Sequence, residues 1–415
     1  GNKMDTKEFK CRACGSSHYH MLLNMGDVPL ANAFVKDEQG IEDKSRWPLS
    51  LVMCSSSSCR LLQIRDDVPR EKLFSDYLWV TSTSAGAKDH AEWLSKQLWD
   101  KFGSTNRSPF LVEIASNDGF FLEHYKDVGF KITGVDPSNL ADEADARGLT
   151  TIRDFFGESV ANRIVVSNGK ADLIVARNVL GHSSQMRDLV AGMKELLAED
   201  GTLILEVPYA FMLRDETQYD TIFHEHPSYL TIGSIHNLFK NFELKITDIQ
   251  YVNMNGGSVI CEIKHSGNLV SANDNISLAF EQFIGLNEPI GWERFSQDVQ
   301  RQKSLLIEML TNLKAEGKRV VAYGAAAKFM TMLNYCGVDS DLIEAVGDAN
   351  PRKQKLLCPG VRIPVVSPRE LMDMKPDYVL IGAWNFKKEI IEFLKNEFKY
   401  DKSFIVPLPI PEIIK

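Results

Sequence analysis

Between residues 107 and 265, short apolar segments alternate with stretches whose apolar positions recur at helical spacing. Apolar segments of this length are typical of buried strands in a parallel sheet. The pattern predicts strands at 110–114, 131–135, 173–176 and 202–207. It therefore predicts an α/β domain.

Similar patterns occur outside this domain. Residues 87–102 and 275–315 have helical periodicity, and a second α/β unit begins at 319–324, with further strands at 345–347 and 378–381. The expected layout is a small β-rich module at 1–75, a helical linker at 76–106, an α/β domain at 107–270, a helical connector at 271–316 and a second α/β domain at 317–415.

The composition limits the classes of function. The chain has 415 residues, of which 44% are apolar and 25% are charged, as in a globular protein of several domains. No apolar stretch approaches the roughly 20 residues that span a bilayer. A net charge of −9 argues against a nucleic-acid surface. We expect a small-molecule partner, no membrane contact, and a monomer or weak homodimer.

Four cysteines near the N-terminus form two close pairs, Cys11 with Cys14 and Cys54 with Cys59. Two such pairs separated by a long loop are typical of a four-thiolate zinc site, which is structural because no ligand position stays open. Two disulfides, or four unrelated thiols, are the alternatives. The other cysteines are scattered singly and no signal peptide is evident, so we favour zinc and a reducing, cytoplasmic location.

The strand at 110–114 leads into a tight turn of small and polar residues, and the next strand ends in Asp136. Doubly wound folds bind nucleosides at such turns, and an acid at the second strand suits ribose hydroxyls. The turn and the acid together favour a nucleoside site over an ordinary strand–helix turn. The turn lacks the full dinucleotide glycine pattern, which favours S-adenosylmethionine (SAM) over a dinucleotide. The candidate cofactor residues are Glu113, Ala115, Asn117, Gly119, Asp136 and Asn178.

Other polar residues are ambiguous alone. Asn178 is equally well explained as a loop cap, and a lone histidine such as His182 is more often structural than catalytic. Residues 154–156 would stack an adenine or belong to the core, and we favour the core. In the second α/β domain, Lys328 and Asn385 are candidate contacts for a nucleotide or phosphate near helix starts, unless that domain is a degenerate scaffold.

The segment 220–229 places His224, Glu225 and His226 directly before a proline. Three titratable side chains in a row make a poor core segment. Two histidines at this spacing bind metals in some proteins, but no third ligand occurs at a diagnostic distance along the chain. A solvated loop is the alternative.

Several motifs occur in one order along almost the whole chain. They are Cys11 with Cys14, Pro29-Leu-Ala-Asn-Ala-Phe34, Tyr77 ahead of Ser82 and Ser84, Glu113-Ile-Ala-Ser-Asn-Asp-Gly119, His224-Glu-His226, Gly324-Ala-Ala-Ala-Lys328 and Trp384-Asn-Phe386. This ordered set resembles the nucleotide-sugar C-methyltransferases that build branched deoxysugars. The resemblance implies an N-terminal zinc-binding module, a class I methyltransferase Rossmann-like domain and a C-terminal Rossmann-like domain.

The resemblance also implies a chemistry, the SAM-dependent methylation of a carbon in a nucleotide-linked keto-deoxysugar. Such methylation needs a base that removes the proton beside a keto group, and an environment that stabilises the enolate. By resemblance, His226 is the base, Glu225 supports it, and His182 and Tyr77 contact the sugar or enolate. His224 is a further substrate-binding candidate. Methylation of oxygen or nitrogen, and a non-catalytic zinc-ribbon protein with a vestigial fold, are the alternatives.

The chain departs from this family at Phe223. Family members have a tyrosine at this position, directly before the His-Glu-His segment. The loss of that phenol predicts a different sugar, a slower enzyme, or transfer of its role to Tyr219 or Tyr229. Ala115, at a position where glycine is common, is a milder departure.

Overall fold

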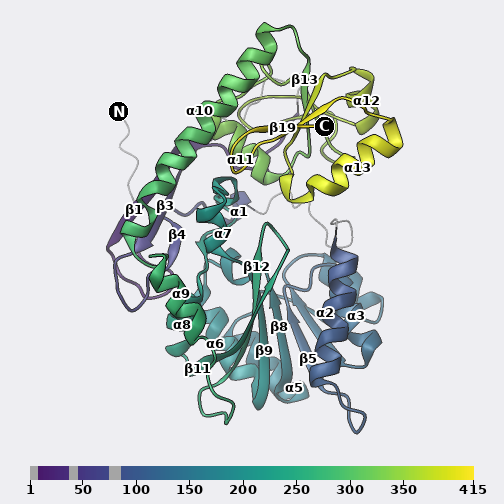
Figure 1. Ribbon diagram of the computed structural model, residues 1–415. Coiled ribbons are helices and arrows are strands. Elements are labelled where there is room, and N and C mark those ends of the chain that lie inside the picture. Colours follow the sequence, from purple (N-terminus) through teal and green to yellow (C-terminus); the bar gives the residue numbers. More distant parts are fainter. Residues whose placement is uncertain (1–7, 37–44, 74–85) are drawn as a thin grey trace.

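The computed structural model of this chain describes residues 8–36, 45–73 and 86–415. Three main β-sheets organise these residues (Figure 1). A seven-stranded sheet forms the lower domain in this view, a six-stranded sheet forms the upper domain, and a four-stranded sheet lies at the left between them. The long helix α10 (Glu293–Ala315) runs from the four-stranded sheet to the upper domain. Nowhere in the described ranges is a helix both long enough and apolar enough to cross a membrane.

The lower domain contains the parallel sheet that the alternating pattern predicts. Its strand order is β11-β12-β9-β8-β5-β6-β7, with antiparallel pairing only at β11 and β12. The strands are β5 (Phe110–Ile114), β6 (Lys131–Asp136), β7 (Thr151–Arg153), β8 (Ala171–Arg177), β9 (Leu197–Pro208), β11 (Leu244–Val252) and β12 (Ser258–His265). The four predicted strands are thus confirmed. Because parallel strands end at a common edge, the turn after β5, Asp136 and Asn178 share the carboxyl edge of the sheet.

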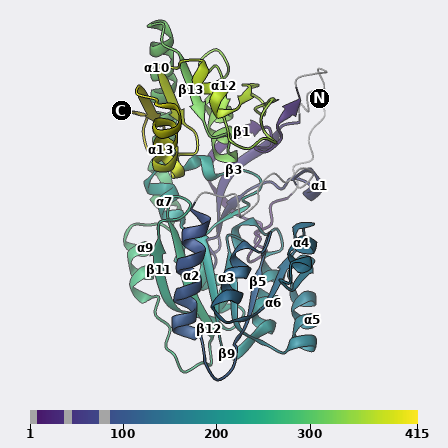
Figure 2. The ribbon, with the colours of Figure 1, turned by 90° about the vertical axis from the view of Figure 1, so that its right-hand side faces the viewer.

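Helices cover both faces of this sheet (Figure 2). Helices α2 (Ala87–Phe102) and α3 (Phe120–Val128) pack on one face, and α5 (Glu158–Asn168) and α6 (Met186–Leu196) pack on the other. Successive strand residues point to opposite faces, so Leu111 and Val112 of β5 enter two different cores. Residues 87–102, expected to belong to a linker, are instead a layer of the lower domain, because Leu94 and Leu98 are buried in its core.

The upper domain is a second α/β unit. Its strand order is β16-β14-β13-β17-β18-β19, parallel except at β19. The strands are β13 (Val320–Tyr323), β14 (Val346–Gly347), β16 (Val365–Val366), β17 (Tyr378–Ile381), β18 (Ser403–Val406) and β19 (Glu412–Ile414). Its helices are α11 (Ala327–Cys336), α12 (Pro368–Asp373) and α13 (Lys387–Phe398).

The small N-terminal sheet is completed by a strand from a distant part of the chain. Strands β1 (Tyr19–Val28), β3 (Trp47–Cys54) and β4 (Leu62–Ile64) are local, but the fourth strand is β10 (Ser228–Tyr229). β10 pairs antiparallel with β4 and directly follows the His-Glu-His segment. A further pair, β2 (Val35–Lys36) with β15 (Leu356–Leu357), joins this module to the upper domain.

The connector is two helices rather than one, α9 (Asn275–Phe283) and α10. The chain turns between them at Gly285, whose φ of +66° is unfavourable for other residues. Glu281 of α9 is fully buried and accepts hydrogen bonds from Tyr209, from Asn287 and from the first two amides of α8 (Ile232–Lys240). The remaining helices are α1 (Arg70–Leu73), α4 (Leu140–Ala146), α7 (Ala210–Asp215), η3 (Leu180–His182), η4 (Tyr219–Thr221), η5 (Pro289–Trp292) and η6 (Trp384–Phe386).

Candidate active site

The four N-terminal cysteines converge. Their sulfurs all lie within 4.8 Å of one another, with 3.7 Å between Cys11 Sγ and Cys59 Sγ and 3.5 Å between Cys14 Sγ and Cys54 Sγ. Sulfurs at about 2.3 Å from a tetrahedral zinc would be about 3.8 Å apart, so the cluster fits that ion. Contacts from Cys54 and Cys59 lower the pKa of Cys11, and the contact with Cys11 raises the pKa of Cys54 and of Cys59 in return. None of the four cysteines forms a disulfide, so all four thiols are available to bind a zinc ion.

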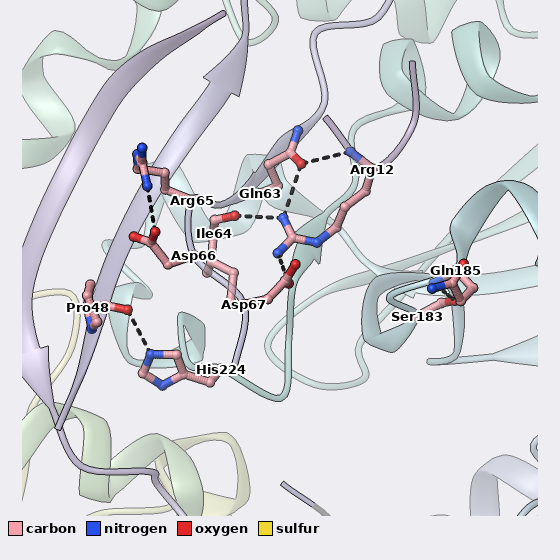
Figure 3. Close-up of polar contacts among 10 residues, drawn as sticks. All are labelled: Arg12, Pro48, Gln63, Ile64, Arg65, Asp66, Asp67, Ser183, Gln185 and His224. Atoms are coloured by element: carbon pink, nitrogen blue, oxygen red, sulfur yellow. Dashed lines mark hydrogen bonds and ion pairs between the residues drawn. The ribbon is translucent and has the colours of Figure 1, made fainter. Parts of the chain in front are cut away.

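Hydrogen bonds connect the cysteine cluster to β4, and Figure 3 shows those that Arg12, the residue after Cys11, makes to that strand. Gln63 donates from Nε2 to Cys11 Sγ over 3.2 Å. The backbone amide and Nη1 of Arg12 donate to Gln63 Oε1, and Nη1 also donates to the Ile64 carbonyl over 2.6 Å. Arg12 completes its contacts with an ion pair to Asp67. Because Gln63 lies on β4, the position of the cluster determines the position of that strand.

The turn after β5 has the geometry of a nucleoside-binding turn. Gly119 has φ +82°, and a Cβ atom there would lie 2.8 Å from Leu149, so a larger residue does not fit. Asp136 is held on both sides, by the amide of Asn117 on Oδ2 at 2.9 Å and by the amide and hydroxyl of Ser138 on Oδ1. Ala115 is exposed beside it with φ +58°. The turn and the acid therefore lie together at the carboxyl edge of the sheet.

Two buried oxygen atoms at this edge have no hydrogen-bond partner among the described residues, Glu113 Oε1 and Asn178 Oδ1. Burial raises the pKa of Glu113 to about 8, and the nearby Arg177 charge opposes that shift. Unpaired acceptors in a buried position are energetically unfavourable. They fit a ligand that brings hydrogen-bond donors, as the amino and hydroxyl groups of SAM do.

Phe155 is not a core residue, although the sequence favoured the core for residues 154–156. Its ring is 49% exposed after β7, whereas Phe156 packs against the core. The Asp154 amide donates to the Asp136 carbonyl over 3.1 Å, which continues the pairing of β6 with β7. A ring exposed at the carboxyl edge, next to Asp136, is suitably placed to stack on an adenine.

We expect Asp136→Ala to weaken SAM binding about tenfold or more, because the variant loses the ribose contact and loosens the turn at Asn117. Asp348→Ala is the matched control. Asp348 ends β14 of the upper domain and accepts the Ala325 and Asn350 amides, both at 2.8 Å, in the same arrangement as Asp136. Isothermal calorimetry with SAM would measure both variants, and equal affinities would show that the ribose binds elsewhere.

His226 is fixed by its own loop. Its Nδ1 atom lies 3.0 Å from the Thr221 carbonyl, so Nδ1 carries the hydrogen and Nε2 keeps a free lone pair. The ring of Phe223 lies against it, with centroids 3.9 Å apart, and that of His182 meets it edge-on at 4.4 Å. Burial lowers the pKa of His226 well below 6.5, whereas His182 is an exposed residue. The structure thus brings His182 and His226 together.

The N-terminal module holds the rest of the segment. Asn32 donates from Nδ2 to both carboxylate oxygens of Glu225, at 2.8 and 2.7 Å. His224 is buried and donates from Nε2 to the Pro48 carbonyl of β3 over 2.9 Å (Figure 3). Burial raises the pKa of Glu225 to about 6. His224 therefore points to the zinc module, and the hydrogen bond that orients His226 comes from Thr221 rather than Glu225.

The upper domain closes the site from the other side. Trp384 donates from Nε1 to Oδ2 of the buried Asp220 over 2.5 Å, and Lys328 Nζ lies 4.8 Å from the Trp384 ring centroid. Lys353 is the second cation. It donates to the Ala325 carbonyl over 2.7 Å, and its charge opposes the rise in the pKa of Glu225. All three parts of the chain thus contribute side chains around His226.

Tyr219 and Tyr229, the two candidates to replace the tyrosine that family members have at position 223, contact other groups. Tyr219 is fully buried and donates to Gln302 over 2.6 Å, away from His226. The Tyr229 hydroxyl lies 3.5 Å from the Thr221 carbonyl, the same oxygen that holds His226. Tyr77, the remaining candidate, lies outside the described residues. Asn385 is half-buried in η6, directly after Trp384.

Five polar contributors at the site were not identified from the sequence, namely Asn32, Asp220, Thr221, Lys353 and Trp384. Asn32 and Trp384 lie within motifs of the ordered set, and Asp220 and Thr221 begin the segment that contains the histidines. A motif indicates that a residue has a role, but only the fold shows that Asn32 faces Glu225.

Comparisons with known proteins agree with this organisation. Three family models match, described as "Putative zinc binding domain" over residues 11–74, "Methyltransferase domain" over 90–249 and "C-methyltransferase C-terminal domain" over 253–409. The C-methyltransferase NovU of Streptomyces niveus is 32% identical over 408 residues, which cover 98% of this chain and 96% of NovU.

Solved structures resemble part of the chain. Magnesium protoporphyrin IX methyltransferase of Synechocystis PCC 6803 with bound SAM is 14% identical, and the match covers 44% of this chain and 80% of that one with a TM-score of 0.33. The PH0226 protein of Pyrococcus horikoshii OT3 is 13% identical, and the match covers 48% and 100% of the two chains with a TM-score of 0.35.

Proposed function

The chain belongs to the C-methyltransferase family of NovU and uses SAM, and we propose that it methylates a carbon beside the keto group of a nucleotide-linked deoxysugar. The observation that carries the proposal is His226, whose Nδ1 is bound to the Thr221 carbonyl and whose Nε2 is free. Such a histidine is a general base with one defined basic atom. Since its pKa lies below 6.5, the ring is neutral, and therefore basic, at pH 7.

Methylation at carbon requires a base, because the sugar carbon beside the keto group must first lose its proton. A proton on carbon is removed only when the charge left behind is delocalised, as it is onto the oxygen of a neighbouring keto group. His226 would take the proton, Glu225 would support the base, and His182 and Tyr77 would contact the sugar or its enolate. Bound SAM supplies a methyl group activated by a sulfonium. Glu113, Ala115, Asn117, Gly119, Asp136 and Asn178 would hold it at the carboxyl edge.

The remaining assignments extend this proposal. Lys328, Asn385 and His224 would contact the substrate. Zinc would be held by the four clustered thiolates as a structural ion. A reducing compartment such as the cytoplasm suits those thiolates. We propose a monomer or weak homodimer.

A screen of keto-sugar nucleotides with methyl-labelled SAM tests this function. We expect label in one sugar product, with a new carbon-linked methyl group in its NMR spectrum and the loss of one proton beside the keto carbon. Sugar nucleotides reduced to the alcohol at the keto position are the matched control, because they lack the acidic proton. Label on oxygen or nitrogen would instead establish heteroatom methylation, in which His226 has no need to act on carbon.

A further inference from the structure

Lys328 brings a buried positive charge to the site. It lies in the first turn of α11, and its Nζ atom is buried without a hydrogen-bond partner among the residues described. Its close neighbour is the ring of Trp384, whose centroid is 4.8 Å away and whose face attracts a cation. A buried ammonium that lacks an acceptor is unfavourable at rest. It is typical of a group that meets an anion during function.

Asp220 and Trp384 hold this charge in place. Trp384 donates to Asp220 Oδ2, and the other oxygen of Asp220 is buried without a partner in the described ranges. Burial lowers the pKa of Lys328, and the Asp220 carboxylate opposes that shift. The pair therefore favours the ammonium form while leaving its donors unused.

Lys328 is linked to the proposed base through Trp384 and the adjacent residues Asp220 and Thr221. Asp220 lies in η4, whose last residue, Thr221, provides the carbonyl that holds His226. Burial and His182 lower the pKa of His226, and the charge of Lys328 adds to that effect, as expected of a cation close by. Base and cation thus come from two domains and act at one position.

We propose that Lys328 stabilises the oxygen anion that forms when His226 deprotonates the sugar, an inference that rests on the proposed function. In this step the carbon–hydrogen bond breaks and its proton moves to His226 Nε2. The electron pair of that bond forms a double bond to the keto carbon, and the carbonyl π electrons move to the oxygen. The ammonium donates a hydrogen bond to this oxygen, which is more negative than the ground-state carbonyl, so Lys328 acts mainly on the transition state.

The nucleotide diphosphate is the other anion of such a substrate. It is attached to the anomeric carbon, on the far side of a hexose ring from a keto group at carbon 4. The keto oxygen, in contrast, is on the carbon next to the one that loses its proton. A cation close to the base is therefore near the keto oxygen and remote from the diphosphate.

Lys328→Met removes the charge and keeps most of the side-chain length. With dTDP-4-keto-6-deoxyglucose and S-adenosylhomocysteine in deuterated water, we expect proton exchange to slow on the order of 10²-fold, the usual effect of losing an oxyanion donor. Calorimetry with dTDP alone should give an unchanged Kd. Lys328→Arg keeps a cation and should recover part of the rate. Proton NMR measures the exchange.

Lys303→Met is the matched control, because Lys303 Nζ also lies 4.8 Å from a ring, that of Tyr335, but away from His226. It should exchange at the normal rate. Normal exchange in Lys328→Met, or a weaker dTDP Kd with normal exchange at saturating sugar, would overturn the inference. Lys328→Gln repeats the test if the methionine variant does not bind SAM. Absence of both exchange and carbon methylation in the unsubstituted enzyme, across the whole screen, would contradict the proposed function itself.

Discussion

His226→Asn is expected to lose proton exchange and methyl transfer together, each on the order of 10²-fold or more, the usual contribution of a positioned general base. Asparagine keeps a donor that reaches the Thr221 carbonyl, so the loop should keep its shape while Nε2 is lost. SAM binding should be unchanged, because the cofactor residues lie on β5, β6 and β8 of the lower domain. Exchange is measured in deuterated water, transfer with labelled SAM, and binding by calorimetry.

His265→Asn is the control for this experiment. Like His226, His265 bonds a main-chain carbonyl, with its Nε2 atom 2.9 Å from the oxygen of Leu197, and it is the last residue of β12. Both activities should remain. His224→Asn should affect exchange less than His226→Asn, since the His224 Nε2 atom already donates to Pro48. Near-normal transfer by His226→Asn would eliminate this histidine as the base and favour His182, or methylation of a heteroatom.

Much of the fold follows from local patterns in the sequence. The helix at 87–102 and the strand at 110–114 have the predicted bounds, since burial on one or both faces leaves a periodic signal. The proposed sites for zinc and SAM were inferred from short motifs for a similar reason. Two close thiolate pairs, or a strand followed by a tight turn, contain most of their geometry within a few residues.

The candidate active site could not be predicted as fully, because its contacts join distant segments. Nothing near Asn32 in the sequence indicates that it will hold Glu225, and nothing near Ser228 indicates a strand of the zinc module. The role of Phe223 is similar. The sequence shows the loss of a phenol, whereas the structure shows a ring packed on His226, which restricts the imidazole without supplying a proton.

Removal of zinc is expected to abolish methyl transfer although the ion takes no part in the chemistry. Cys59 is followed closely by β4, and β4 pairs with β10 directly after His226, with the Ile64 amide donating to the Pro227 carbonyl over 2.9 Å. Structural zinc contributes about 10–16 kcal/mol to the folding of small zinc modules, so its loss should unfold this one. A base displaced by about 1 Å costs on the order of 10²-fold in rate.

Cys59→Ser and treatment of the natural chain with a chelator should therefore both lower the thermal midpoint and the rate of transfer. SAM binding should persist, because the face of the lower sheet that carries α2 and α3 has its own core. Ser57→Ala, an exposed change within the same cysteine knuckle, should alter neither quantity. Since zinc, β4 and the His-Glu-His segment form one continuous chain of contacts, an enzyme that keeps normal transfer after losing its zinc would show that β10 holds its place without the module. The position of His226 would then depend on the lower and upper domains alone.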